Sequence, residues 1–557
     1  MRSLAFTRAR VRRGRRAGAA VPVTPSPGRA ELGPDSRRAV APPPPEDRAM
    51  RAYLASSIGA ACTAALVLPA LTPEASAASR VPDVPGSTQS LPLVPLPGRE
   101  RAAGGTVAQG LPQRETRPFS LVGVVWEDPD RELHASVQVR TRATGSGAWS
   151  PWQDVESHDA AHAPDPGSPE RAAGTVRGAT APLWVGASDA VAVRVRPESA
   201  PGAPRSATPP LPGGLRLELV DPGDGLPQTP RPETPQPGSP QPEVPQPELP
   251  QPEAPQPEAP QPEVPQPGSP VNPAPQKPPP LNPLPERPEI AVPGEGVYEE
   301  LPGFVVDPAL TASLTPESAA ASAVNADLAP LGADAILPLT KAETEAQAMA
   351  YGFAKPYIGP RPGIVTRKGW GADEALREKQ FVYTKTVQAA FVHHTATGNR
   401  FTCAQSASVL RSIYRYHVES SGWRDIGYNF AVDKCGNIYE GRAGGVAKPV
   451  LGAHTRGFNT NSMGIAVLGT YSSTAPPKAA VEAIAKLTAW KLGLFGVNPK
   501  STTYLTSGGG NKYAKGTKAK LNVISGHRDG FATDCPGTLL YGQLGTARTV
   551  AARLQGR

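Results

Sequence analysis

The sequence predicts an α/β domain over residues 361–557, a small antiparallel β-sandwich over residues 118–222, and a proline-rich linker between them. Three observations support this fold class. Apolar runs alternate with amphipathic segments beyond Arg361, as in α/β proteins. Short period-2 runs separated by Gly, Pro and Asp follow one another from Phe119 to Val220, as in small β-sandwiches. A PQPEx unit repeats over residues 227–270, and such a composition prevents a packed core.

Composition and charge limit how much of the chain can fold compactly. The 557 residues include 70 Pro and 56 Gly, so a large part is unsuited to a packed core. The net charge of +8 is unevenly spread, because residues 1–49 carry +7 and residues 361–557 carry +16. A basic C-terminal unit on an acidic stalk favours an anionic partner, for which nucleic acid and an anionic cell wall are candidates. The alternative is a solvated basic surface without a partner.

The first 77 residues predict export. Residues 1–49 are rich in Arg and Pro and show no fold; they are either a disordered basic extension before a true start at Met50 or a long leader region. Residues 50–77 have a basic start, an apolar run and small residues up to Ala77, the pattern of a signal peptide. Ser, Gly and Thr interrupt the apolar run, so we expect no membrane span in the mature chain.

Export makes the cysteine count informative. Cys62 is lost with the signal peptide, which leaves three cysteines, and an odd number outside the cell requires a reason. Cys403 and Cys435 can pair, which leaves Cys535 as a thiolate ligand. The rival interpretation is a disulfide between Cys535 and one of the other two.

The middle of the chain contains little that predicts chemistry. Residues 78–117 are expected to be spacer. For the β-sandwich-like domain of residues 118–222 we expect an accessory role, either as a wall-binding unit or as a spacer, with its tryptophans packing in the core or on the sheet. The Pro-rich linker of residues 223–290 favours polyproline II, in which its 44 repeat residues would reach about 140 Å. Residues 291–360 are expected to be mostly irregular, with one amphipathic helix around Thr340–Ala350.

The C-terminal region predicts alternating strands and helices. Two heptad-like apolar faces predict helices over residues 404–418 and Lys478 to Leu494, and a last helix is expected over residues 540–554. Buried strands are predicted at AAFVHHT, at MGIAVLG and before His527, and a strand-turn-strand unit at IGYNFAVDKCGNIYEGR.

Three of these residues are candidate metal ligands. His393 ends an apolar strand, and His527 and Cys535 are spaced H-x7-C on the loop after another strand. Two imidazoles and a thiolate leave the fourth position of a tetrahedral zinc open, as in catalytic sites. By itself this spacing is a weak signal, because the His393–His394 pair can simply be packed and Cys535 can belong to a disulfide.

Six motifs in series give these residues a context: RKGWGA, FVHHTA, HV-x5-W-x-DIGYNF, G-x-IYEGR, GAHTRGFN-x-NSMGI and GHRD-x5-CPG. Together they resemble the peptidoglycan recognition protein family, the zinc-dependent type 2 N-acetylmuramoyl-L-alanine amidases. The resemblance covers residues 361–540 and nothing N-terminal to them. It implies a central mixed β-sheet flanked by helices, with zinc in a groove on one face.

The resemblance also implies roles for individual residues. The expected zinc ligands are His393, His527 and Cys535. Tyr428 and Thr533 are expected beside the reacting water as catalytic groups. The remaining implied positions are the substrate-binding residues His454, Asn461 and Arg442, and the disulfide partners Cys403 and Cys435.

The implied function is that of a secreted, wall-associated Zn²⁺ amidase, which cleaves the bond between the lactyl group of N-acetylmuramic acid and L-alanine. Its partner is peptidoglycan, as muramyl peptides, with anionic wall polymers as a further partner. We expect a monomer that binds no nucleic acid. One alternative is a recognition module that binds peptidoglycan without catalysis, and another is a wall-tethered structural protein.

Overall fold

The computed structural model describes residues 86–97, 107–157, 161–198, 209–223, 314–350 and 357–557. The basic extension, the signal peptide and the PQPEx repeat lie outside these residues, and their predictions stay untested. The described residues all belong to one compact unit that spans Ala77–Arg557. Within the described ranges, no helix combines the length and the apolar character needed to cross a bilayer.

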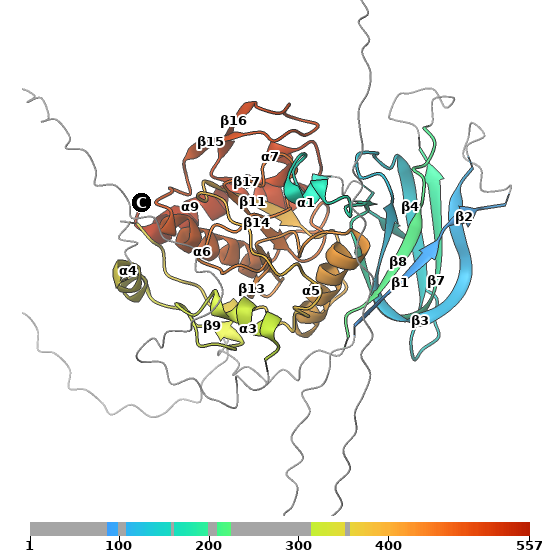
Figure 1. Ribbon diagram of the computed structural model, residues 1–557, viewed down its shortest axis with the longest axis horizontal. Coiled ribbons are helices and arrows are strands. Elements are labelled where there is room, and N and C mark those ends of the chain that lie inside the picture. Colours follow the sequence, from blue (N-terminus) through green and yellow to red (C-terminus); the bar gives the residue numbers. More distant parts are fainter. Residues whose placement is uncertain (1–85, 98–106, 158–160, 199–208, 224–313, 351–356) are drawn as a thin grey trace, which may run out of the picture. The chain divides into compact units, whose positions relative to one another are not determined.

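The N-terminal half is β-rich, as expected. Its strands are hydrogen-bonded in the order β1-β8-β3-β7-β4-β5, with β2 and β6 also paired to β3. Every pair is antiparallel, and Figure 1 shows these strands in blue to green. The strands are β1 (Ser87–Pro92), β2 (Val94–Pro95), β3 (Gln109–Trp126), β4 (Ala135–Ala143), β5 (Gln153–Val155), β6 (Gly178–Ala179), β7 (Leu183–Pro197) and β8 (Arg216–Asp221).

This sheet begins earlier than the sequence predicted. The expected spacer over residues 78–117 contains β1, β2 and the first part of β3, so the prediction was wrong there. Prolines hid these strands, because an edge strand such as β1 tolerates Pro that a central strand does not. Two tryptophans, Trp126 and Trp184, are buried as expected. Trp149 and Trp152 are half-buried and both contact the guanidinium of Arg140.

The C-terminal half is built on a mixed sheet, which confirms the α/β prediction. The strand order is β17-β11-β14-β12-β13-β10-β9. The β17, β11, β14 and β12 strands are mutually parallel, whereas β13 runs antiparallel to β12. Its strands are β9 (Ala335–Ile336), β10 (Ile364–Val365), β11 (Ala389–His394), β12 (Phe430–Val432), β13 (Ile438–Glu440), β14 (Ser462–Val467) and β17 (Ile524–Gly526).

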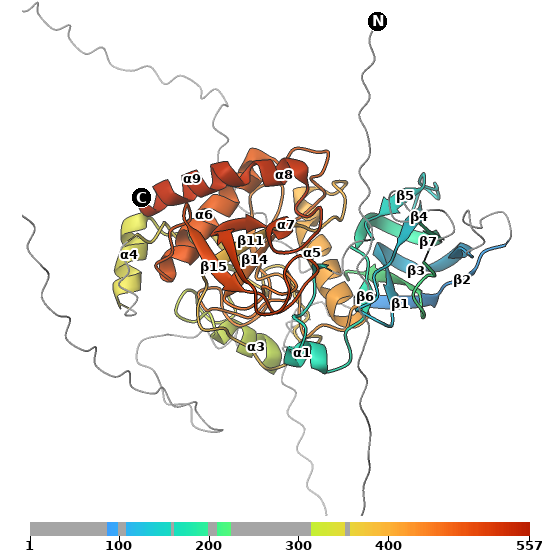
Figure 2. The ribbon, with the colours of Figure 1, turned by 90° about the horizontal axis from the view of Figure 1, so that it is seen from above.

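Helices cover this sheet where apolar faces predicted them. The helix α6 (Lys478–Leu494) lies beside α9 (Leu544–Gln555) in both views (Figures 1 and 2). Residues of both helices pack against β11 and β14 in one core, in which Leu487, Trp490 and Ile465 are at most 2% exposed. Burial of side chains of this size contributes about 1.5–3 kcal/mol each. The remaining helices are α1 (Pro169–Ala172), α3 (Pro316–Ala323), α4 (Lys341–Ala350), α5 (Ser406–Arg415), α7 (His527–Gly530) and α8 (Thr538–Gly542).

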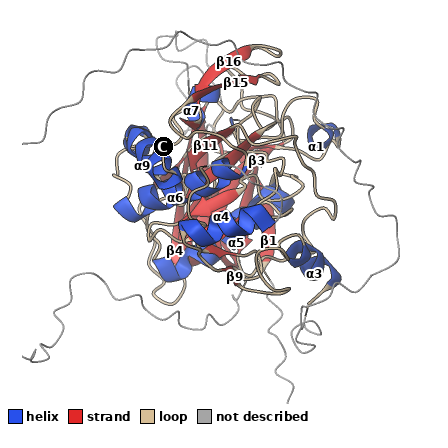
Figure 3. Cartoon of the chain, turned by 90° about the vertical axis from the view of Figure 1, so that its left-hand side faces the viewer, coloured by secondary structure: helices blue, strands red, loops and turns tan. Residues whose placement is uncertain are grey.

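Two features differ from the expected plan of this half. The sheet and the segments packed against it begin before residue 361. The β9 strand pairs with β10, and the side-chain amide of Asn325 donates a hydrogen bond to the Glu440 carboxylate at 2.9 Å. The region expected to be mostly irregular therefore contains α3 and β9, besides the predicted helix, which is α4. The Gly- and Lys-rich stretch forms a hairpin of β15 (Thr502–Thr506) and β16 (Lys518–Asn522), visible in red in Figure 3.

The two halves share a hydrophobic core. Side chains of α5, including Leu410 and Ile413, belong to one buried cluster with Leu121, Val125 and Val220 of β3 and β8. All five are at most 1% exposed. The helix predicted over residues 404–418 therefore buries its apolar face against both halves, and it ends in a π-helical turn, Tyr416–Ser420.

Candidate metal centre

The parallel strands β11 and β17 bring two histidines together. Val392 of β11 is opposite Gly526 of β17, so the next residues, His393 and His527, leave the same edge of the sheet. His527 begins the short helix α7, and both imidazoles are fully buried. The carboxyl edge of parallel strands is a common place for functional side chains.

A turn after α7 brings Cys535 to the same edge of the sheet as His393 and His527. The Arg528 amide donates to the Cys535 carbonyl at 3.0 Å, which closes the loop. The Cys535 amide donates to the hydroxyl of Thr533 at 3.3 Å. Cys535 is 1% exposed and lies outside the disulfide, which joins Cys403 to Cys435 with 6.2 Å between their Cα atoms. The predicted disulfide pairing is thus present, and the rival pairing of Cys535 is absent from the structure.

The three predicted ligands converge, and a fourth side chain joins them. The ligand atoms of His162, His393, His527 and Cys535 all lie within 4.8 Å of one another. The Nε2 atom of His162 is 3.1 Å from the Nδ1 atoms of both His393 and His527. The Cys535 Sγ atom is 3.6 Å from His162 Nε2 and 3.7 Å from His393 Nδ1.

These spacings match the edges of a zinc tetrahedron. Bonds of about 2.0–2.1 Å to nitrogen and about 2.3 Å to sulfur imply edges of about 3.3 Å between nitrogens and 3.5 Å between nitrogen and sulfur. Four of the six edges have these lengths: 3.1 Å for two nitrogen pairs and 3.6–3.7 Å for two nitrogen–sulfur pairs, and the other two edges are within 4.8 Å. The four residues therefore fit a tetrahedral metal ion with soft and borderline ligands, for which zinc is the usual occupant.

Contacts on the outer side of the imidazoles orient both rings, and one of these contacts sets the tautomer of His527. His527 Nε2 lies 3.1 Å from the carbonyl oxygen of Ala161, so this nitrogen carries the proton and Nδ1 offers a lone pair to the centre. His393 Nε2 lies 3.3 Å from the Thr455 hydroxyl. Such outer partners orient metal-ligating histidines. Burial, followed by the neighbouring histidines, lowers the pKa of His393 and His527 well below 6.5, so both rings are neutral, the form that ligates metals.

The expected catalytic groups lie beside this cluster. Tyr428 is buried, with its ring centroid 5.5 Å from that of His393 and 5.8 Å from that of His162. Thr533 is half-buried, and its hydroxyl accepts the Cys535 amide proton as described above. The structure therefore brings Tyr428 to the metal-binding cluster and uses Thr533 to hold the ligand loop.

Two of the three expected substrate-binding residues, His454 and Arg442, are buried, whereas Asn461 is half-buried. His454 is fully buried, and its Nδ1 atom is 3.0 Å from the Thr455 hydroxyl. Burial lowers the pKa of His454 to about 3. Asn461 has a φ of 59°, a left-handed conformation that Asn tolerates in turns. Arg442 is buried and forms an ion pair with Glu170 at 2.9 Å.

Sequence reasoning missed three residues of the site. His162 stands in a polar loop of the N-terminal half, where no spacing pattern links it to the motifs of the C-terminal domain. Thr455 and Asn459 lie inside the GAHTRGFN motif but were not assigned roles. The Asn459 side chain accepts the amide protons of His454 and Thr455 at 2.7 and 2.9 Å, and the position of these residues beside a predicted site residue was the available signal.

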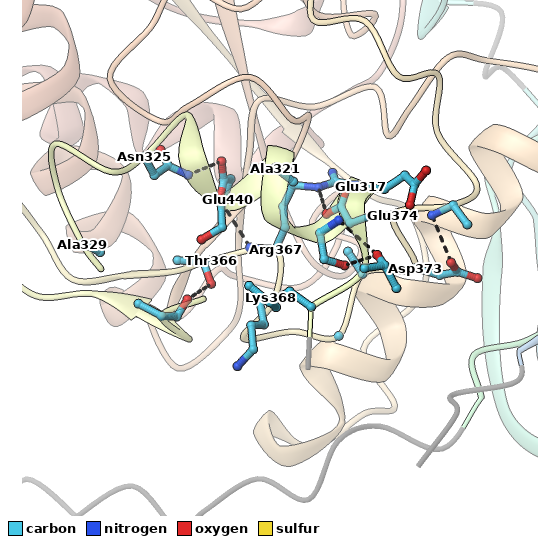
Figure 4. A pocket seen from close by; sticks show the side chains of 18 of the residues that line it. Glu317, Ala321, Asn325, Ala329, Thr366, Arg367, Lys368, Asp373, Glu374 and Glu440 are labelled. Carbon is cyan, nitrogen blue, oxygen red and sulfur yellow. Dashed lines mark hydrogen bonds and ion pairs between the residues drawn. The ribbon is translucent and has the colours of Figure 1, made fainter. Parts of the chain in front are cut away.

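A separate pocket of about 280 Å³ lies under α3 (Figure 4). It is lined by Arg367, Glu374 and Glu440 among others. Arg367 pairs with Glu374 at 2.6 Å, and both side chains are almost fully buried. None of the metal-cluster residues lines this pocket, so it is distinct from the candidate metal centre.

The fold and site define a protein with a mixed α/β domain that carries a buried His/Cys metal-binding cluster. A family model described as N-acetylmuramoyl-L-alanine amidase matches residues 383–538. A second model, described as Rv3811 N-terminal galactose-binding domain-like, matches residues 73–213.

Individual proteins resemble the same C-terminal region. Peptidoglycan-recognition protein SC2 of Drosophila simulans is 30% identical over 183 residues, which are 33% of this chain and 85% of that protein. N-acetylmuramoyl-L-alanine amidase of Homo sapiens is 32% identical over 201 residues, 35% of this chain and 30% of that protein. The solved structure of human PGRP-IBETAC in complex with glycosamyl muramyl pentapeptide is 26% identical, covers 33% of this chain and 94% of that chain, and has a TM-score of 0.26. Through its C-terminal domain, the chain belongs to the peptidoglycan recognition protein and type 2 amidase family.

Proposed function

We propose that the protein is a secreted, zinc-dependent N-acetylmuramoyl-L-alanine amidase. It would hydrolyse the amide bond between the lactyl group of N-acetylmuramic acid and the L-alanine of the stem peptide. The observation that carries this proposal is the convergence of His393, His527 and Cys535 at one buried edge of the sheet. The family contains curated amidases of this specificity, such as that of Homo sapiens.

The side chains of this site suit hydrolysis of an amide. A zinc ion held there would supply a Lewis acid and a water molecule of lowered pKa. His393 and His527 are kept neutral by burial, and their outer nitrogens are held by Thr455 and Ala161, so both rings keep a fixed direction. Tyr428, beside His393, is suited to donate a hydrogen bond to the developing oxyanion.

Recognition of peptidoglycan without hydrolysis is the second candidate. Peptidoglycan-recognition protein SC2 and other relatives are named for recognition rather than hydrolysis. One observation on this chain favours it, because four protein side chains rather than three surround the candidate metal position. A metal site with four protein ligands leaves no coordination position for a reacting water, so it would not turn muramyl peptides over.

Digestion of peptidoglycan by the full chain distinguishes the two candidates. The full chain is required because the two halves share a hydrophobic core. We expect mass spectrometry to find sugar strands with free lactyl groups and stem peptides with a free L-alanine amino terminus. A chelator or the variant Cys535→Ser should reduce both products to background.

The matched control is Tyr504→Ala, which changes a 61% exposed side chain on β15, away from the predicted ligands, and should retain activity. Equal product from wild type and Cys535→Ser would refute the amidase proposal. Muramyl-peptide binding without any product, from wild type and from variants of residues 161–170 that open the fourth ligand position, would leave recognition as the function.

A further inference from the structure

One segment of the N-terminal half enters the metal-binding cluster. His162 is 7% exposed, and its Nε2 atom lies within 3.1 Å of two predicted ligand nitrogens. The preceding residue, Ala161, accepts hydrogen bonds from His527 Nε2 and from the Arg456 amide at 3.1 and 3.0 Å. This segment follows β5 in the chain, outside the region that matches the amidase family model.

Further contacts fix the rest of this segment, residues 161–170, which we name the covering segment. Asp165 accepts the Gly457 amide proton at 2.7 Å and a proton from the Asn459 side chain at 2.6 Å. Asn459 also donates to the carbonyl of Ala163 at 2.9 Å. The covering segment is therefore bonded to the GAHTRGFN loop by three acceptors, at positions 161, 163 and 165.

The far end of the covering segment binds the arginine that was expected to contact substrate. Both Glu170 oxygens accept from Arg442, at 2.9 and 3.0 Å, and one also accepts the Arg424 amide proton at 3.0 Å. Both side chains of the ion pair are at most 7% exposed. A cavity of about 280 Å³ next to this pair is lined by Glu170, Arg442 and Phe381.

A single explanation accounts for these contacts. Catalytic zinc sites keep one coordination position open, whereas closed four-ligand sites are structural. The ligand atom of His162 lies within 4.8 Å of those of His393, His527 and Cys535, so it is placed to be the fourth ligand of a metal ion held there. The same segment also forms hydrogen bonds with Arg442, with the side chain of Asn459 and with the amide of Gly457.

We propose that the covering segment is an intramolecular inhibitor, in which His162 is the fourth metal ligand and Glu170 occupies Arg442. Docked, the segment closes the metal site and covers the groups that would meet a muramyl peptide. Release of His162 opens one position for water while three protein ligands remain. The inference rests on the proposed amidase function only for its effect on turnover, because the four-ligand geometry stands without it.

The test uses the full chain in two states, metal-free and loaded with Co²⁺ in place of zinc. The first variant, His162→Ala, removes the fourth ligand. The second, Asp165→Ala/Glu170→Ala, loosens the segment without removing any of the four ligand side chains from the chain. The control is His134→Ala, because His134 is a half-exposed histidine of the same half, and its imidazole lies 3.8 Å from the Glu132 carboxylate.

Three readouts follow the state of the segment. In the Co²⁺ protein, added azide should shift the visible spectrum of both variants and leave wild type and His134→Ala unchanged. In the metal-free protein, iodoacetamide should alkylate Cys535 at least about tenfold faster in the variants, since Cys535 is 1% exposed when the segment is docked. Peptidoglycan turnover should rise at least about tenfold in Asp165→Ala/Glu170→Ala.

The readouts separate failure of this inference from failure of the proposed function. Wild type and His162→Ala could respond equally to azide and be alkylated at equal rates. That result would overturn the proposal that the covering segment is an inhibitor, whatever rate of peptidoglycan turnover is measured. Azide and alkylation responses confined to the variants, with no product from any protein, would retain the segment and remove the amidase function.

Discussion

Substitutions that break the ion pair between Glu170 and Arg442 would measure how much this pair contributes to docking of the covering segment. Breaking a buried pair by removing one partner costs about 3–5 kcal/mol when the other charge stays buried. Burial by itself would raise the pKa of Glu170, but Arg442 and the Arg424 amide outweigh burial, and the pKa lies below 4.5. Glu170 is therefore ionised at neutral pH, and the pair is a true charge pair.

Replacement of Glu170 should act on docking more than on the global fold. With Glu170→Ala, Arg442 keeps its bonds to the Ile426 and Asp425 carbonyls, and release of the segment lets water reach its guanidinium. A loss of 3 kcal/mol corresponds to about a 150-fold shift of the docking equilibrium. Glu170→Gln keeps the shape and one acceptor, so it should lose about 1–2 kcal/mol, or roughly 5- to 30-fold.

Hydrogen exchange measures this shift directly. The amides of Arg456 and Gly457 donate to the segment at 3.0 and 2.7 Å, so their exchange should accelerate in the order wild type, Glu170→Gln, Glu170→Ala. Global unfolding by denaturant should change much less, since the shared core is untouched. Wild-type exchange rates in Glu170→Ala, or acceleration spread equally over both halves, would refute the reasoning.

The remaining predictions concern pH, a glycine and the disulfide. Burial, opposed by the Gly457 and Asn459 hydrogen bonds and by Arg456, raises the pKa of Asp165 from 3.8 to about 6. Docking should therefore weaken by about 30-fold as the pH rises from 4 to 6, and Asp165→Asn should abolish this dependence in hydrogen exchange. A methyl group at Gly464 would lie 2.4 Å from the His454 ring, so Gly464→Ala should destabilise the fold by about 1–3 kcal/mol in urea unfolding, whereas Gly545→Ala, which meets no neighbour within 4 Å, should not. The Cys403–Cys435 disulfide spans 32 residues and should stabilise the chain by about 3–4 kcal/mol, measured as the difference in urea unfolding between wild type and the double serine variant; an equal unfolding free energy would contradict that value.

Much of the C-terminal fold could be predicted from the sequence because the apolar residues of its strands and helices follow clear patterns. The buried strands β11 and β14 coincide with short, mostly apolar runs, and α6 coincides with apolar residues that recur at helical spacing between Lys, Glu and Thr. The three predicted ligands converge because two parallel strands end at one edge, a consequence of local pattern plus topology. The β1 and β2 strands were missed because Pro and Gly dominate their surroundings, and composition alone describes such sequences as spacer.

His162 could not have been found from local pattern. A ligand that comes from another half of the chain has no fixed spacing from its partners, and its loop lacks strand or helix periodicity. Only the shared core, in which α5 packs against β3 and β8, determines that this loop lies over the metal-binding edge. The missed residue is thus a product of tertiary packing, whereas the ligands that were found are products of local sequence.

The shared core also explains why a covering segment can persist on a reactive site. A ten-residue loop that docks from solution loses conformational entropy of about 1–2 kcal/mol per backbone residue, which few hydrogen bonds could offset. Here much of that entropy is lost when the halves fold together, because β5 and β6 are fixed by the sheet on either side of the segment. The contacts of His162, Asp165 and Glu170 then need only hold a loop that is already close, so loss of one or two of them is sufficient to open the metal site without unfolding either half.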